Sequence, residues 1–409
     1  KHFTFREIII ITFTFLSLIY STSFHYSSSP PNDTFEPGQF FVEPSGEGIG
    51  DPIIDKYFKD HGLFYKTYFR DGKWSNGFHP RIMTGWNDMW KSSAMSSDIG
   101  YYILYAGYYA GLIEEIKFPD NHPKAAFAAF KYRVLLPMIV GNISKISKIS
   151  KKSEYEWSDK YISRLVYIFL WVNFFCIIST AFLFMFFLIN AFSFSKNLSI
   201  FGAILFITLP IVTRTAGFPQ TEPISLLITL LLFISVFYKR VVYFLILSFL
   251  GLLVKDLFIY TSVLWFFNFE FLKEKNVIKY IKHFMISASP LFFFIFIRFL
   301  YSDGAGLETR GSYDIFKGEL PPWSMGSSIY YYLEKYFLVF TFLWVGILNI
   351  NKNIFLRKSV LTLIFLTFIS LWIARGSGIV RHVGLLFPII IPMFLYFFHK
   401  KNEQAKNTI

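Results

Sequence analysis

The chain is divided into long apolar blocks by short connectors that carry much of its positive charge. Each block has roughly 15 to 30 residues, which suits a helix that crosses about 30 Å of hydrocarbon. A helix is required there because lipid offers no partner for an open backbone N–H or C=O group. The pattern therefore predicts an all-α polytopic membrane protein with about ten transmembrane helices. The expected spans are residues 7–22, 161–192, 199–216, 223–238, 241–254, 257–270, 284–300, 328–348, 358–374 and 383–398.

Composition and charge agree with a membrane protein and exclude a nucleic-acid-binding one. Of the 409 residues, 54% are hydrophobic and only 16% are charged, whereas soluble domains have about 25% charged residues. The formal net charge of +13 comes from basic residues at the ends of apolar blocks, where the positive-inside rule places them. No stretch interleaves basic and aromatic residues as a nucleic-acid surface does. We therefore expect membrane lipid as a partner, and no nucleic acid.

A polar region at residues 23–160 follows the first block. It contains many Pro, Gly and Trp residues, so we expect a large folded extracytoplasmic loop and not a linker. Its apolar segments 99–113 and 125–140 are short for spans and are expected to form interfacial helices. If both segments crossed the membrane, the bundle would have about twelve transmembrane helices, with the later orientation unchanged.

The turn at Lys255 and Asp256 sets the expected orientation. A single helix over 241–270 would place the Lys-rich segment 273–282 outside, against the positive-inside rule. Two short spans that meet at Lys255 and Asp256 return this segment and the other basic connectors to the cytoplasm, together with both termini. The predicted regions are a first transmembrane helix at 1–22, the extracytoplasmic loop at 23–160, a helix bundle at 161–399 with an outer loop at 301–327, and a cytoplasmic tail at 400–409.

Two carboxylates of the first outer loop are candidates for acid–base chemistry. Asp51 and Asp55 are four residues apart, so they would share one face of a short helix. A carboxylate near the membrane surface can act as a general base toward an acceptor hydroxyl. Asp51 fits equally as the N-cap of a helix that Pro52 begins, with Asp55 a solvated charge. The sequence leaves both interpretations open.

Several cations are expected on the outer face, where the positive-inside rule disfavours them. Any single one could extend to the lipid headgroups. Arg375 and Arg381, however, flank a Gly-Ser-Gly turn, where two guanidiniums could hold a phosphate. Glu222 either orients a sugar hydroxyl or a bound cation, or is simply favoured at a helix N-terminus. The predicted substrate-binding residues are Glu222, Lys255, Asp256, Arg375, Arg381, His382, Arg214 and Arg298.

Motifs that the chain lacks narrow the function further. It has no Asp-x-Asp pair, no His/Cys cluster, no Walker loop and no Gly-x-Ser-x-Gly. We therefore expect no metal and no cofactor, and we do not expect ATP-driven transport. The spans nearly lack the carboxylates that proton-coupled transporters use, and the two halves do not look like inverted repeats.

Four segments and the overall layout resemble the GT-C superfamily of lipid-phosphate-dependent glycosyltransferases. Thr-Glu-Pro at 221–223 is similar to the start of a Leu-rich span in bacterial members. Gly-Leu-Leu-Val-Lys-Asp at 251–256 is similar to their Gly-Leu-Leu-x-Lys-Glu turn. The Arg-His pair at 381–382 resembles their Arg before a Pro-containing last span, and 132–137 resembles a segment of related bacterial membrane proteins.

This resemblance implies an inverting glycosyltransferase in a bacterial cytoplasmic (inner) membrane. Its donor would be a polyprenyl-phosphate-linked sugar, and its acceptor a lipid, glycan or protein. Asp51 is the best match for the catalytic base and Asp55 the second, while Lys255, Arg375 and Arg381 would stabilise the departing phosphate without a metal. A flippase or permease for a lipid-linked or anionic substrate, and a structural envelope subunit, are the alternatives. Other acids that could be the base are Asp33, Glu36 and Glu47.

The orientation makes a prediction that reporter fusions can test. A reporter that is active only in the cytoplasm should be active when fused after Lys239, Lys275 or Lys358, because each of these fusion points lies in a basic connector. It should be inactive after Asp256 and Gly318. Activity of the Asp256 fusion, or its absence at Lys275, would show that residues 241–270 do not form two spans.

Overall fold

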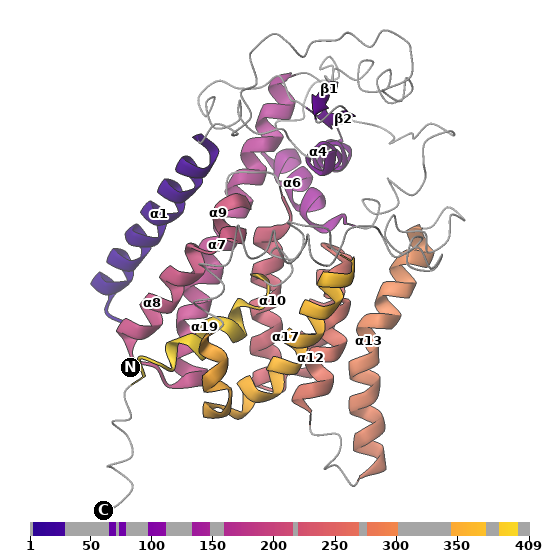
Figure 1. Cartoon of the computed structure of the whole chain (residues 1–409). Helices are drawn as coiled ribbons and strands as arrows, with labels where there is room; N and C mark the ends of the chain where they lie inside the picture. Colours follow the sequence, from indigo (N-terminus) through magenta and orange to yellow (C-terminus); the bar gives the residue numbers. More distant parts are fainter. Residues whose placement is uncertain are drawn as a thin grey trace, which may run out of the picture.

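The computed structural model of the chain is a bundle of helices with one small β-hairpin (Figure 1). It describes residues 3–28, 65–70, 73–78, 97–111, 133–147, 159–215, 220–269, 276–301, 345–373 and 384–399. The elements of the first half are α1 (Phe5–Ser28), β1 (Tyr65–Arg70), β2 (Lys73–Phe78), α4 (Ser97–Ala110), α6 (Leu135–Ile146), α7 (Asp159–Phe192), α8 (Lys196–Ile207) and α9 (Pro210–Thr215). Those of the second half are α10 (Glu222–Phe237), α11 (Val241–Leu252), the 3-10 helix η1 (Asp256–Tyr260), α12 (Thr261–Asn268), α13 (Val277–Tyr301), the 3-10 helix η4 (Val345–Lys352), α17 (Ile354–Ile373) and α19 (Phe387–Leu395).

The helical character expected from the apolar blocks is confirmed. The helices α1, α7, α10, α11 and α17 overlap the predicted blocks with small differences at their ends. The predicted interruption at Lys255 is also present, because α11 ends at Leu252 and η1 begins at Asp256. The amides of Val254 and Lys255 both donate to the Gly251 carbonyl, at 2.9 and 2.8 Å, and so close the turn.

The predicted block at 199–216 is not one helix. It consists of α8 and α9, which are separated at Thr208 and Leu209. Pro210 has no amide hydrogen, so it cannot continue the hydrogen-bond ladder of α8, but it is well suited to begin the next helix. The single span predicted over this block is therefore corrected to two helices.

The predicted block at 284–300 begins too late. α13 starts at Val277, because Asn276 caps it: the Asn276 Oδ1 atom accepts from the amides of Ile278 and Lys279 at 3.0 and 3.3 Å. An asparagine at the N-cap satisfies amides that have no partner within the helix. The first turn of α13 therefore carries lysine that the sequence pattern placed in a connector.

The described parts of the first loop are ordered elements, as expected of a folded region. The segment predicted at 99–113 overlaps α4, and α6 overlaps the end of the segment predicted at 125–140, whose first residues lie outside the described ones. The two helices pack together closely, since a Cβ atom on Gly141 would lie 2.6 Å from the Ala106 carbonyl oxygen. The antiparallel hairpin of β1 and β2 was not predicted. Its strands flank an Asp-Gly dipeptide, a strong hairpin signal.

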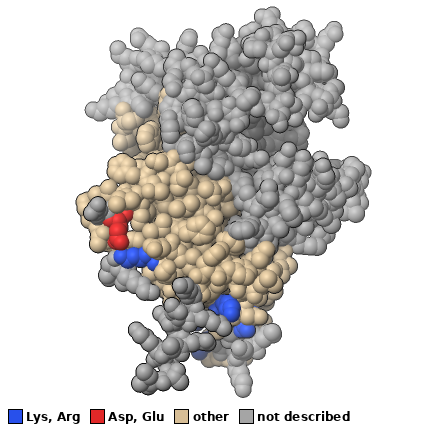
Figure 2. Space-filling view, turned by 60° about the vertical axis from the view of Figure 1, so that its left-hand side comes forward, with Lys and Arg blue, Asp and Glu red and all other residues tan. Residues whose placement is uncertain are grey.

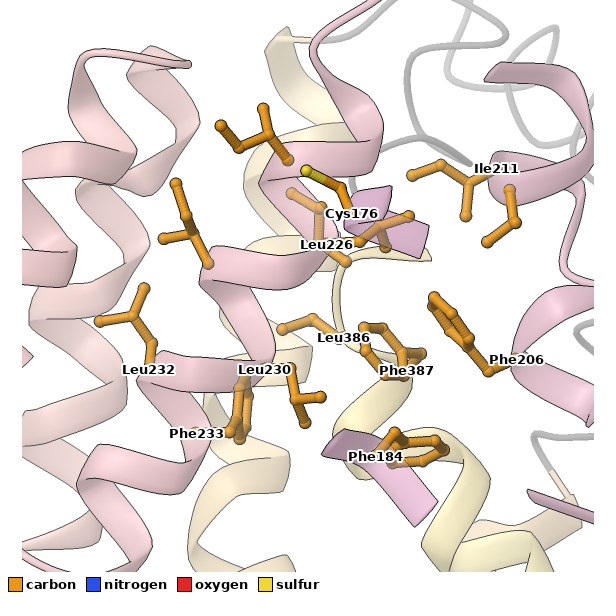
Figure 3. Close-up of a cluster of buried hydrophobic side chains, with 14 of the residues drawn as sticks. Cys176, Phe184, Phe206, Ile211, Leu226, Leu230, Leu232, Phe233, Leu386 and Phe387 are labelled. Atoms are coloured by element: carbon orange, nitrogen blue, oxygen red, sulfur yellow. The ribbon is translucent and has the colours of Figure 1, made fainter. Parts of the chain in front are cut away.

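The helix α10 lies at the centre of the bundle, against α7, α9, α11 and α12 (Figure 1). Most of its side chains are buried. Beside it, Figure 3 shows the rings of Phe184, Phe206 and Phe387 gathered from α7, α8 and α19. The centroid of Phe387 lies 4.9 Å from that of Phe184 and 4.5 Å from that of Phe206. Aromatic pairs at such distances add to the free energy gained by burial alone.

Two described helical segments are long and apolar enough to cross a membrane, Tyr167–Phe192 and Val277–Ile297. Five further apolar helices are shorter. The total number of spans stays a prediction. The described surface in Figure 2 is nevertheless nearly devoid of charge, with its few charged side chains in the lower half of the view. On α13, Phe292, Phe296 and Phe299 are 55%, 52% and 78% exposed.

A proline inside α13 leaves one carbonyl without its usual donor. Pro290 has no amide hydrogen to give to the Ile286 carbonyl, four residues earlier. The Ser289 hydroxyl donates to that carbonyl instead, over 2.7 Å. Since Ile286 is 7% exposed, water cannot easily replace this bond, and the hydroxyl completes the helix.

We expect Ser289→Ala to lower the free energy of unfolding by about 1–3 kcal/mol, the cost of a buried polar group without a partner. Pro290→Ala restores the amide donor, so Ser289→Ala should cost much less in that background. Unfolding of the four proteins in detergent, followed by circular dichroism, measures the difference. An equal cost in both backgrounds would show that the hydroxyl does not replace the backbone donor.

Candidate functional site

A buried ion pair joins the start of α10 to the turn after α11. The Lys255 ammonium donates to Glu222 Oε1 over 2.6 Å. The Glu222 side chain is 0% exposed and that of Lys255 is 12% exposed. Because removing charges from water is costly, each charge here depends on the other. Two residues that were predicted separately as substrate ligands are therefore in direct contact.

A second ion pair lies beside the first. An Arg133 guanidinium nitrogen lies 3.4 Å from Asp256 Oδ2, and the two side chains are 21% and 26% exposed. Asp256 directly follows Lys255 in the chain, so the two ion pairs meet at the same turn. We call Arg133, Glu222, Lys255 and Asp256 the paired cluster.

The backbone holds the paired cluster in place. The Leu135 amide donates to the Leu253 carbonyl over 3.2 Å, which joins the start of α6 to the α11–η1 turn. The turn itself is closed by the ring of Phe258, since a Cβ atom on Gly251 would lie 2.5 Å from that ring. Glycine is needed at this position because any larger residue would push the ring, and with it the turn, away.

The same face of α10 holds the turn at a second point. Thr229 is seven residues after Glu222, so both lie on one face of the helix. The Thr229 and Tyr260 hydroxyls are hydrogen-bonded at 3.0 Å, and Tyr260 is 1% exposed. Glu222 and Thr229 therefore fix η1 against α10 at both of its ends, which limits how far Lys255 can move.

The paired cluster can position two cations at one place. An ammonium has three N–H donors. A guanidinium likewise has five N–H donors in a fixed plane. Cations held by carboxylates in this way are suited to bind an anionic group, such as a phosphate, with little reorganisation.

The other predicted site residues are not described in the same detail. Asp51, Asp55, Arg375, Arg381 and His382 lie outside the described residues, as do the outer loop at 301–327 and the tail at 400–409. Arg214 is on α9 and Arg298 is near the end of α13, but their side chains are outside the described part. Their roles stay predictions.

Arg133 was missed as a site residue. It belongs to the segment 132–137 that carries part of the family resemblance, but nothing in its spacing assigned it a partner 123 residues away. The signal in the sequence was that resemblance, which marked the segment but gave Arg133 no role of its own.

In the described part of the chain, no group of three His, Cys, Asp or Glu side chains could hold a metal ion. Comparison with protein-family models, with curated proteins and with solved structures finds no match for this chain. The chemistry of the paired cluster therefore follows from its own four residues.

The buried pair makes a prediction about stability. Lys255→Met should lower the free energy of unfolding by about 3–5 kcal/mol, because it leaves the Glu222 charge buried and uncompensated. Adding Glu222→Leu should recover most of the loss, since two apolar side chains can fill the same space. Thermal unfolding in detergent measures both effects.

The control for this experiment is the pair of Lys196 and Glu7, at 3.3 Å, whose side chains are 31% and 44% exposed. Lys196→Met should change stability little, because solvent screens an exposed pair. If Lys255→Met were as mild as Lys196→Met, the Lys255–Glu222 contact would not be a buried ion pair.

Proposed function

We propose that this chain is a membrane-embedded glycosyltransferase whose donor is a sugar linked to a polyprenyl phosphate. The observation that carries the proposal is the paired cluster, in which two carboxylates hold Lys255 and Arg133 at one end of α10. The acceptor would be a lipid, glycan or protein on the outer face of the membrane. The resemblance of the segments 221–223 and 251–256 to the GT-C superfamily supports the same activity.

The paired cluster would act on the leaving group. As the bond between the anomeric carbon and the phosphate oxygen breaks, negative charge develops on the departing lipid phosphate. Lys255 and Arg133 are suited to stabilise that charge with N–H donors that are already in place. Arg375 and Arg381 would add a bidentate contact. Glu222 and Asp256 are positioning residues, since they act through the two cations.

The base belongs to the first outer loop in this proposal. Asp51, or Asp55 in second place, would take the proton of the acceptor hydroxyl as the oxygen attacks the anomeric carbon. A new glycosidic bond forms on the face opposite the departing phosphate, so the configuration is inverted. Elements of the same loop pack near the paired cluster, because β2 contacts α4, α4 contacts α6, and α6 begins beside the α11–η1 turn.

A lipid environment is also part of the proposal. The apolar surface of α13 would be covered by lipid, because aromatic side chains there are exposed along its length. Lys239 and Lys352 lie beside the opposite end of α10 from Glu222, as expected if that end faces the cytoplasm. We propose a multi-pass protein of a bacterial inner membrane with both termini in the cytoplasm.

Asp51→Asn should abolish sugar transfer and leave folding unchanged, because the amide keeps the shape of the side chain but cannot accept the proton. Asp55→Asn should have a milder effect. The assay uses purified protein in sealed vesicles, a set of polyprenyl-phosphate monosaccharides with labelled sugar, and an extract of membrane lipids and glycans as acceptor. It measures the release of polyprenyl phosphate and the labelled product.

The outcomes separate the candidate functions. Label that crosses the vesicle without release of polyprenyl phosphate would indicate the flippase or permease instead. Full transfer by Asp51→Asn alone would assign the base to another acid of the loop. Full transfer by both variants would contradict a first-loop carboxylate base altogether.

A further inference from the structure

A cavity of about 560 Å³ lies at the other end of α10 from the paired cluster. α10 has 16 residues, so the two places are separated by about 24 Å along its axis. The walls come from the α10–α11 turn, the end of α12, the first turns of α13 and the η4–α17 turn. The paired cluster contributes no residue to it.

Part of the lining of this cavity is basic. Lys239, Lys352 and Lys358 line it, and none of the described lining residues is Asp or Glu. Neither Lys239 nor Lys352 forms an ion pair with a described residue. The positive end of the α17 dipole is also here, since α17 begins next to Lys352 and is capped by Asn353. The cavity therefore attracts an anion.

Another part of the lining is aromatic. The rings of Phe269 and His283 are stacked with centroids 3.3 Å apart, and Trp265 is stacked on His283 at 6.0 Å. Phe237 and Phe355, which also line the cavity, meet edge to face at 5.2 Å. An anion bound beside the lysines would thus have apolar surface next to it. This combination suits an amphipathic ligand better than a small hydrated ion.

The backbone at Lys239 points to a role for its ammonium group. Lys239 has φ 55°, in the left-handed region that favours glycine. The Lys239 amide donates to the Val236 carbonyl at 3.1 Å and the Arg240 amide donates to the Ser235 carbonyl at 2.7 Å. This is the helix-ending motif in which glycine is commonest. A lysine at this position costs stability, and Lys239 is one of the residues that line the cavity.

We propose that this cavity binds the phosphate headgroup of an anionic phospholipid, with Lys239 and Lys352 as its main ligands. Basic pockets between helices on the cytoplasmic side of a membrane are suited to such headgroups. The lipid chains would lie along the exposed apolar side chains nearby, such as Tyr243 and Phe284. The site shares the membrane environment with the proposed glycosyltransferase, but it does not depend on sugar transfer.

The test is native mass spectrometry of the detergent-purified full chain with added phosphatidylglycerol. Phosphatidylcholine with the same acyl chains is the neutral comparison, and inorganic phosphate is the competitor. We expect selective binding of phosphatidylglycerol that inorganic phosphate at equal concentration does not displace. Lys239→Gly and Lys352→Gln should each weaken binding about fivefold, and the double variant about 30-fold.

The variants keep the result separate from folding. Glycine suits the left-handed backbone at residue 239, so Lys239→Gly should be at least as stable as the original chain. The matched control is Lys279→Gln, on the exposed side of α13 and outside the cavity, and it should bind normally. Equal binding of both lipids, or unchanged binding by the double variant, would overturn the site. Displacement by equimolar inorganic phosphate would overturn the lipid headgroup as its ligand.

Discussion

The contact between Glu222 and Lys255 constrains much of the bundle. A carboxylate with no exposed surface at the first turn of the central helix is tolerable only with a cation against it. That cation comes from a turn, so α11 must end before it and η1 must begin after it. This turn also requires glycine at residue 251, because the ring of Phe258 packs directly against it. One ion pair thus links the burial of α10 to the path of the chain through the next two helices.

The two ends of α10 have contrasting chemistry. At its start, each described cation of the paired cluster lies against a carboxylate from another element. At its end, lysines from the α10–α11 and η4–α17 turns surround a cavity whose described walls include no acid. The apolar length between them is nearly free of charge, since Glu222 is the only charged residue of α10. Two basic connectors therefore lie at the same end of α10, and the orientation that places this end in the cytoplasm stays a prediction.

The sequence predicts best where one strong local pattern acts. The long apolar block of α7 and the charged interruption at Lys255 are both visible in the chain and both present in the structure. The break at Pro210 and the cap at Asn276 were misjudged because hydrophobicity outweighed residues that end or begin helices. The hairpin of the first loop has a clear turn signal in Asp-Gly, but its strands are short and largely polar, so the pattern of apolar blocks does not reveal them.

Contacts between residues far apart in the chain could not be predicted from the sequence pattern. Glu222 and Lys255 were each predicted as outer-face site residues, yet 33 residues separate them and no spacing rule pairs them. Arg133 and Asp256 are 123 residues apart. Such pairs depend on how helices pack, which requires the side chains of several elements at once. Hydrophobic periodicity identifies the buried face of a helix, but it does not identify the element that packs against that face.

The balance of charge in the paired cluster has a consequence for kinetics. Its two cations and two carboxylates carry no net charge, so its field fades within a few ångströms. At physiological ionic strength the screening length is about 8 Å. The field of the paired cluster is already weak at that distance, so dissolved salt changes it little. The four residues of the paired cluster should therefore recognise a ligand by close-range fit, whereas the described lysines at the other end of α10 act at longer range and attract an anion less as ionic strength rises. A single helix thus connects a charge-balanced cluster with a basic cavity whose attraction for anions is sensitive to salt.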